Sequence, residues 1–438
     1  MGRTMLGLAS ALVSLVLFLL PAFTLAEESY TFNADEVEKK PYFLGGYIEF
    51  RPTLYGLDND AALYKVRFFD RSLGDTLMEY NGKLFLDAGL RKDPFSVFLQ
   101  SSTDYKDSQV TSQLSTTLYQ GYVSFKPSDS FTADGGKRTL KWGKGYAWSP
   151  AAFFDRPKDP DDPELALEGF WVGTADYIKS FTTNLKTFSL TPVVLPSYQD
   201  VNDDFGETGH VNVGGKAYFL FHDTDIDLMA LAGGSRTVRY GFDFSRNVLT
   251  NLEVHGEFAW IPHFTKPLLT ASGSVAQRTY SAVNYLLGLR FLTAQDTTYI
   301  LEYYFQGVGY SPDEIRDYFR YVDSAYDAFA SGRDARPWTK VQDTLSKSPY
   351  NVSTPMRHYL YLRVTQKEPF DILYFTPALT LIYNLQDSSF QVTPELLYAP
   401  ITNLELRLRA GFLVGGADTE FGEKPFGYRL ELRARYYF

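Results

Sequence analysis

The chain has no cysteine among its 438 residues. It can therefore form no disulfide, no cysteine-ligated metal site, no thiolate nucleophile and no covalent haem attachment of the usual kind. Acidic residues outnumber basic ones: the chain has 52 Asp and Glu but 42 Lys and Arg, which gives a net charge of −10. Phosphate binding needs a concentrated basic surface, so a nucleic-acid partner is not expected.

Long apolar runs are missing after the first 26 residues, where nothing approaches the roughly 18 to 20 apolar residues of a membrane helix. Near the start, Arg3 precedes an apolar stretch over residues 6–20, and Thr24-Leu25-Ala26 offers a small-residue cleavage site. This pattern predicts a signal peptide over residues 1–26 and a short periplasmic segment over 27–42. An uncleaved anchor is the alternative, but acidic rather than basic sequence follows the run.

Aromatic residues, in contrast, are abundant at 16% of the chain, while the mean hydropathy is mildly polar at −0.21. This mixture is typical of a transmembrane barrel that has aromatic girdles outside and water inside. Without a membrane helix, only a closed barrel satisfies the backbone hydrogen bonds of a spanning segment.

The last twelve residues, 427–438, read GYRLELRARYYF and alternate apolar with mostly charged side chains. An extended strand therefore has one apolar face and one charged face. A wall with lipid on one side and a wet lumen on the other explains that alternation, as transmembrane barrel strands do. An edge strand of a soluble sheet is the alternative interpretation.

The same alternation recurs along residues 43–438 and predicts an antiparallel up-and-down barrel of about 18 strands, with 16 or 20 as neighbouring counts. A strand is also expected at Tyr64–Phe68, where apolar residues alternate with Lys65 and Arg67. The 40-to-50-residue repeat of a propeller is not found. Barrels of 16 to 18 strands are wide enough for an aqueous channel. The predicted pore-lining residues share the inward register: Arg363, Arg407, Arg409, Arg429, Arg433, Arg435, Glu395, Glu405 and Glu431.

Both signs of charge occur in that inward set, which predicts either a transverse field across the pore or mutual neutralisation that only stabilises the wall. Inward tyrosines add a candidate aromatic track for flat solutes. Its members are Tyr304, Tyr359, Tyr361 and Tyr437.

Four long segments, residues 144–168, 192–209, 261–280 and 307–356, are expected as extracellular or inward-folded loops, opposite a set of short turns. The segment 144–168 is rich in proline and charge, and Gly143 and Gly145 permit tight bends at its start. It is predicted to be an inward constriction or a plain surface loop. The constriction candidates are Lys144, Arg156, Lys158, Asp159, Asp161 and Asp162, and a weaker hypothesis places Ca²⁺ at Asp159, Asp161 and Asp162, although the spacing is not that of an EF-hand.

The longest segment contains a predicted helix. Ser311 and Glu314 form a capping box with proline at the first helical position, and Gly332 is placed to end the helix. An apolar stripe through Ile315, Phe319 and Val322 must be buried somewhere. The helix either narrows the barrel mouth or caps neighbouring loops. Its Arg316 and Arg320 are constriction candidates too, or else solvated charges.

The C-terminal Phe438, the alternating strands and the interrupting loops together resemble the bacterial outer-membrane porins and porin-like channels. The segments WGKGYAWSP, at 142–150, and LEYYFQGVGYS, at 301–311, are also similar to segments of porin-like barrels. The resemblance implies a Gram-negative outer membrane, passive diffusion of small hydrophilic solutes and a homotrimer, with no cofactor. Expected partners are outer-membrane lipid and lipopolysaccharide, and the barrel-assembly machinery through the C-terminal strand.

Two other function classes remain open. The barrel is alternatively the sleeve of a porin–cytochrome electron conduit, which an open lumen without an inward loop would favour. An outer-membrane enzyme needs an acid–base or nucleophilic group on the wall. His255, between Glu253 and Glu257, is the best candidate, but no partnered serine is evident in the sequence.

Overall fold

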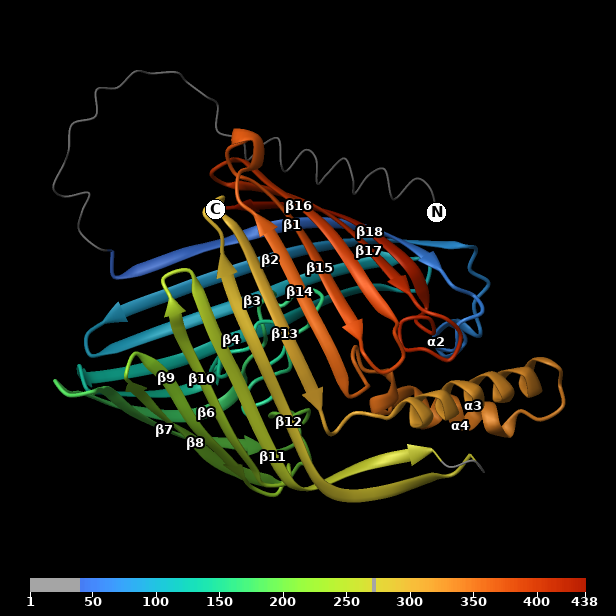
Figure 1. Ribbon diagram of the computed structural model, residues 1–438, viewed down its shortest axis with the longest axis horizontal. Coiled ribbons are helices and arrows are strands. Elements are labelled where there is room, and N and C mark those ends of the chain that lie inside the picture. Colours follow the sequence, from blue (N-terminus) through green and yellow to red (C-terminus); the bar gives the residue numbers. More distant parts are fainter. Residues whose placement is uncertain (1–39, 270–272) are drawn as a thin grey trace. The chain divides into compact units, whose positions relative to one another are not determined.

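The described residues fold into a closed antiparallel barrel of 18 strands (Figure 1). The computed structural model describes residues 40–269 and 273–438. The predicted signal peptide, residues 1–26, and nearly all of the segment 27–42 lie outside the described residues. The predicted strand count and the barrel architecture are confirmed.

The strands follow chain order around the barrel, and each pairs with its neighbours. Their bounds are β1 Tyr42–Leu57, β2 Thr76–Lys92, β3 Phe95–Ser108, β4 Ser112–Ser128, β5 Phe131–Arg138, β6 Phe170–Ser180, β7 Leu185–Ser197, β8 His210–Phe221, β9 Thr224–Ala232, β10 Arg239–Leu249, β11 Leu252–Leu269, β12 Val275–Leu292, β13 Thr297–Gln306, β14 His358–Gln366, β15 Phe375–Asn384, β16 Phe390–Ile401, β17 Leu404–Val414 and β18 Phe426–Tyr437. Closure comes from β1, which pairs with both β2 and β18, so that Glu49 lies opposite Lys83 on one side and Arg435 on the other.

The alternation of the C-terminal strand has the predicted inside and outside faces. Leu430 and Leu432 are 40% and 50% exposed on the outer surface, whereas Glu431 and Arg433, between and after them, are 4% and 2% exposed. Because successive side chains of a strand point to opposite faces, the charged set faces the barrel interior. The outer surface is therefore apolar, and the polar groups are inside.

The predicted strand at Tyr64–Phe68 is wrong. This segment is the helix α2, Ala62–Phe68, in which Tyr64 and Phe68 lie one turn apart and are both buried. They pack together with Leu77 of β2. Five residues are too few for a period of two to be distinguished from a helical period, and tertiary packing decides the outcome.

Two predicted loops are shorter than expected, because strands extend into them. Residues 192–197 belong to β7, which leaves 198–209 as its loop. Within 261–280, β11 continues to Leu269 and β12 begins at Val275, and these two residues pair with each other. Strand β10 stops pairing with β11 at Trp260, so the ends of β11 and β12 continue as a two-stranded ribbon past that neighbour.

The segment between β13 and β14 carries the predicted helix, α3, over Pro312–Ala330. Its capping box at Ser311 and Glu314 is formed, and Gly332 follows it at φ 70°. The stripe of Ile315, Phe319 and Val322 is buried. Further helices are α4, Arg336–Asp343, and the 3₁₀ turns η2, Leu345–Lys347, η3, Pro349–Asn351, and η4, Pro369–Asp371. None of the helices in the described residues is both long and apolar enough to cross a membrane.

Candidate functional site

Residues 139–169, which connect β5 to β6, are called the crossing loop here, because they contact inward side chains of opposite parts of the barrel wall. One anchor is Glu257 of β11, whose carboxylate accepts backbone N–H groups from Lys144 and Gly145, each at 2.6 Å, and from Ala151 at 3.1 Å. A buried carboxylate that accepts several amides is well satisfied and fixes the backbone around it. The start of the loop is thus tied to β11.

A second carboxylate extends this anchor to β13. Glu302 accepts the backbone N–H groups of Tyr146 and Ala147, the latter at 2.9 Å. His255 of β11 lies 2.9 Å from the same carboxylate through Nε2 and is itself buried. In this structure His255 therefore braces an anchor of the loop within the wall.

Trp148 places an aromatic side chain between these anchors and the wall. Its ring stacks on Tyr304 with centroids 5.1 Å apart and also contacts Tyr359 and Tyr361 at 5.8 and 6.0 Å. All three tyrosines are buried. Most of the predicted aromatic track therefore packs against the loop and does not face water, and only Tyr437 is half-buried beside Arg435.

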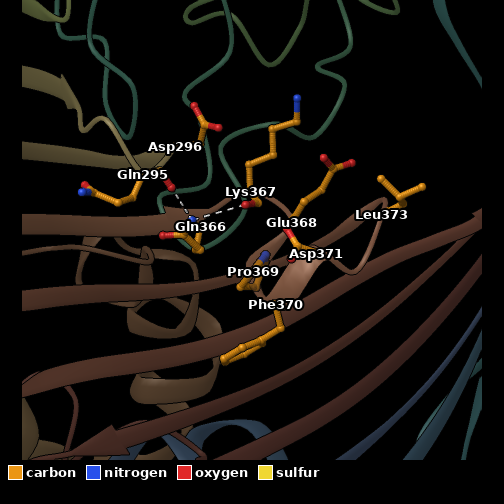
Figure 2. A pocket seen from close by; sticks show the side chains of 9 residues that line it. All are labelled: Gln295, Asp296, Gln366, Lys367, Glu368, Pro369, Phe370, Asp371 and Leu373. Carbon is orange, nitrogen blue, oxygen red and sulfur yellow. Dashed lines mark hydrogen bonds between the residues drawn. The ribbon is translucent and has the colours of Figure 1, made fainter.

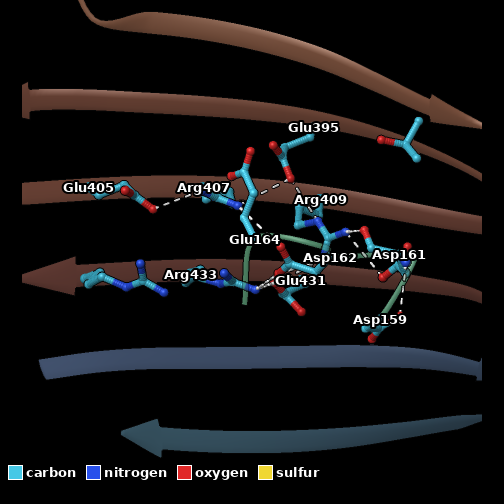
Figure 3. Close-up of polar contacts among 12 residues, drawn as sticks. Asp159, Asp161, Asp162, Glu164, Glu395, Glu405, Arg407, Arg409, Glu431 and Arg433 are labelled. Carbon is cyan, nitrogen blue, oxygen red and sulfur yellow. Dashed lines mark hydrogen bonds and ion pairs between the residues drawn. The ribbon is translucent and has the colours of Figure 1, made fainter. Parts of the chain in front are cut away.

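The other end of the crossing loop is held by charge on β17 and β18 (Figure 3). Arg409 donates to the backbone oxygen of Asp161 at 2.7 Å and pairs with its carboxylate at 3.3 Å, and Arg429 pairs with the same carboxylate. The neighbouring Asp162 accepts from Arg433 at 3.0 Å. Charge-assisted hydrogen bonds of this kind are stronger than neutral ones.

The two carboxylates are held in their ionised form. Burial on its own would raise the pKa of Asp161, but the positive charges of Arg409 and Arg429 outweigh it and lower that pKa below the ordinary value. The same balance, with Arg409 and Arg433 as the cations, lowers the pKa of Asp162. Asp161 and Asp162 therefore act as fixed anions opposite the arginines.

Eight of the nine predicted pore-lining residues belong to this one network. Arg363 and Arg409 each pair with Glu395 at 3.0 Å, and Arg433 pairs with Glu431 at 2.9 Å. Arg407 pairs with Glu405 at 3.4 Å and with Glu395 at 3.7 Å, and Arg429 joins through Asp161. The ninth, Arg435, pairs with Glu49 of β1 at 2.7 Å. Of the two hypotheses, mutual neutralisation describes these contacts, and the crossing loop supplies part of the negative charge.

The cationic constriction candidates do not face those acids across open space. Lys144 pairs with Asp227 of β9 at 3.1 Å, and Lys158 donates to the backbone oxygen of Gly145 within the loop. Burial lowers the pKa of Lys158. Arg156 pairs with Asp204 of the loop that follows β7. The crossing loop also encloses a cavity of about 390 Å³, to which Arg156 and Lys158 contribute.

Arg316 and Arg320 lie outside the lumen network. Arg316 pairs with Asp313 on its own helix, and Arg320 pairs with Asp418 of the loop before β18 at 2.9 Å. Both arginine side chains are exposed. The structure thus separates the helical candidates from the residues of the crossing loop.

Nothing in the described part of the chain groups three or more His, Asp or Glu side chains in a way that would hold a metal ion. Asp161 and Asp162 direct their carboxylates at guanidinium groups, and Asp159 is left on the exposed side of the loop. The calcium hypothesis stays a prediction without support from this geometry.

A second cavity, of about 400 Å³, lies at the opposite end of the barrel, between the turns that join β12 to β13 and β14 to β15 (Figure 2). Gln295, Asp296, Lys367 and Glu368 are among its lining residues, and Phe370 beside them is 91% exposed. It shares no residue with the lumen network.

The sequence matches no known family profile and no curated protein. Its fold is similar to the solved structures of OccAB1 from Acinetobacter baumannii, with a TM-score of 0.52, 10% identity and coverage of 90% of this chain and 96% of that one. A BenF-like porin from Pseudomonas fluorescens Pf-5 gives a TM-score of 0.52 at 11% identity, covering 91% of this chain and 98% of that one. OccK2 (OpdF) from Pseudomonas aeruginosa, solved in complex with glucuronate, gives 0.51 at 10% identity with the same coverage. At these identities the similarity establishes a porin fold.

Proposed function

We propose that this chain, which has the barrel fold of solved outer-membrane porins, is an outer-membrane channel for passive diffusion of small hydrophilic solutes, constricted by its crossing loop. Two features of the barrel support a membrane location: an apolar outer surface and a charged interior. Its 18 strands also leave room for a lumen, whereas an eight-stranded barrel is filled by its own side chains.

The proposed constriction is supported by one observation, which is that the crossing loop is anchored to the wall at two places. Glu257 and Glu302 hold one part on β11 and β13, and the arginines of β17 and β18 hold Asp161 and Asp162. A loose surface loop would not direct buried carboxylates and backbone amides at both sides of the lumen. The loop therefore narrows the pore while remaining fixed within it.

The same geometry favours a channel over the alternatives. A sleeve around a cytochrome needs an open lumen, and the crossing loop occupies part of it. For an enzyme, His255 would have to reach a substrate, but it is buried against Glu302. Contact with lipopolysaccharide, assembly through residues 427–438 and trimer formation accompany the proposal as predictions.

The test is single-channel conductance of the refolded mature chain in a planar bilayer, with the reversal potential measured under a salt gradient. Stable open steps with modest ion selectivity are expected. Heat-modifiable electrophoretic mobility would establish that the barrels are folded. Folded barrels that show no conductance in the bilayer would refute the proposed channel function. They would favour the sleeve of an electron conduit or a surface-binding role.

A further inference from the structure

The crossing loop covers the two sides of the lumen unequally. Within the described residues, its segment 144–168 is joined to the wall by hydrogen bonds and ion pairs to β5, β9, β11, β13 and β16–β18, and by none to β1, β2 or β3. The loop begins and ends next to β4, where Thr139 and Gly169 bond to Gln120 and Tyr119. Among the described residues, the loop therefore makes no polar contact with the middle of the β1–β3 wall.

The β1–β3 wall has its own inward charges. Strand pairing sets Glu49 opposite Lys83 and Lys83 opposite Asp104, and the next inward row runs from Arg51 through Asn81 to Lys106. Glu49 faces inward, because it pairs with Arg435 of the charged β18 face. Residues in the same rows point to the same side of the sheet, so these charges line the lumen as well.

The most exposed of these charges lie on β1–β3, although the ranges meet, since Arg429 of β18 is 18% exposed and Lys83 of β2 is 20% exposed. On β1–β3 the exposed fractions are 27% for Arg51, 20% for Lys83, and 37% for both Asp104 and Lys106. Lys83 and Lys106 are paired as well, with Asp104 at 3.1 Å and Glu79 at 2.7 Å, whereas Arg409 beneath the loop is 3% exposed and is paired on several sides. A charge acts on a passing ion only within about a Debye length, roughly 8 Å at physiological salt, and most strongly where it is not neutralised.

From these observations, which rest on the proposed channel function, we infer that solutes pass between the crossing loop and the β1–β3 wall, where Arg51, Lys83, Asp104 and Lys106 set the ion selectivity. The inward arginines of β17 and β18 have a different role, which is to hold the loop.

The sign of the selectivity follows from which partner of each pair is exposed. Glu49 and Glu79 are 4% and 8% exposed, much less than the Arg51 and Lys106 heads beside them. Permeating ions thus meet the cationic heads first, with Asp104 as an opposing carboxylate. The path therefore prefers anions weakly, although the net charge of −10 would suggest a preference for cations.

The test compares reversal potentials in a potassium chloride gradient. The double variant Lys83→Gln/Lys106→Gln removes two partly exposed cations and is expected to lower the chloride-to-potassium permeability ratio at least about twofold, while Asp104→Asn raises it. The matched control, Arg333→Gln/Arg336→Gln, removes the same charge from the helical segment and leaves the ratio unchanged. A reversal potential that does not respond to the Lys83 and Lys106 substitutions would overturn the inference.

Cysteine chemistry provides an independent readout, since the natural chain has none. Asp104→Cys in an open channel is expected to react with a charged methanethiosulfonate and change the conductance. Thr393→Cys, which is buried on β16 beside Asp161, in the part of the wall that adjoins β1 through β17 and β18, is expected to stay unmodified. The opposite pattern would place the path against β16–β18. A wild-type barrel without conductance would instead refute the channel itself, so the two failures are distinguishable.

Discussion

The crossing loop, residues 139–169, and the helical segment, residues 307–357, both join neighbouring strands at the end of the barrel opposite the C-terminus, yet different forces hold them in place. Carboxylates, backbone amides and arginines anchor the crossing loop at two places, and its apolar side chains, Trp148 in one cluster and Trp142, Phe153 and Phe154 in another, are buried against the wall. The helical segment is held by a buried apolar cluster to which α3, α4 and inward tyrosines contribute. The comparison indicates that charge and pH act on the crossing loop through its polar anchors in addition to packing, whereas packing dominates in the helical segment.

The largest expected effect tests the packing of the helical segment. Phe319→Ala removes a buried ring from α3 and should destabilise the segment by about 3–5 kcal/mol, the usual cost of such a truncation. Hydrogen exchange over α3 and α4 should then speed up markedly. Phe329→Ala on the same helix is the control, because Phe329 is 37% exposed. Equal exchange in the two variants would contradict an apolar anchor.

A smaller effect is expected at the first anchor of the crossing loop. Glu257→Gln keeps the shape of the side chain but replaces one acceptor oxygen by a donor that faces backbone N–H groups, which should cost about 1–3 kcal/mol. Deuterium uptake at 144–151 should rise while α3 stays protected. Glu253→Gln, on the same strand but partly exposed, should leave the loop unchanged. A rise in both variants would show that the strand, and not this anchor, is being disturbed.

The second anchor should depend on pH in a defined direction. Arg409, Arg429 and Arg433 lower the pKa values of Asp161 and Asp162 against the opposing effect of burial, so the anchoring is complete above the ordinary value of 3.8 and is lost as the pH falls through the lowered values. Conductance should therefore not change through loop release between pH 7 and 5, and should rise only in stronger acid. A rise already at pH 6 would contradict this assignment.

The smallest effect belongs to an exposed pair on the helical segment. Arg320→Gln breaks the contact with Asp418, but the arginine side chain is 63% exposed and the pair is screened by water and salt. The free energy of unfolding should change by no more than about 0.5 kcal/mol, and the ion selectivity should not change. A large shift in reversal potential would place this helix in the ion path.

The sequence predicts features that depend on neighbouring residues, but not contacts between residues that are far apart in the chain. Strand alternation, as in Leu432 beside Arg433, and the capping box at Ser311 depend on neighbours in sequence, and both are confirmed. The partner of Arg409 is Asp161, 248 residues away, and periodicity carries no information about such a contact. For the same reason the sequence places Arg409 in the inward register but gives no sign that the crossing loop lies against it.

Glu257 and Glu302 are not among the site residues predicted from the sequence, although the sequence contains a signal that could have identified them as anchors of the loop. Both are inward carboxylates on strands, and a buried carboxylate needs donors from somewhere. A nearby glycine-containing loop can provide them as backbone N–H groups, as Gly145 does. The short helix α2 had no comparable signal, because its seven residues fit two periodicities.

The central claim is that the crossing loop is a constriction held by Asp161 and Asp162. The most direct test is the single-channel conductance of Asp161→Asn/Asp162→Asn against Asp159→Asn, which changes a neighbouring carboxylate that lies on the exposed side of the loop. Loss of the ion pairs should free that end of the loop, so the double variant should show larger and more variable open steps while the control resembles the wild type. Identical conductance in all three proteins, with the barrels folded, would contradict the claim.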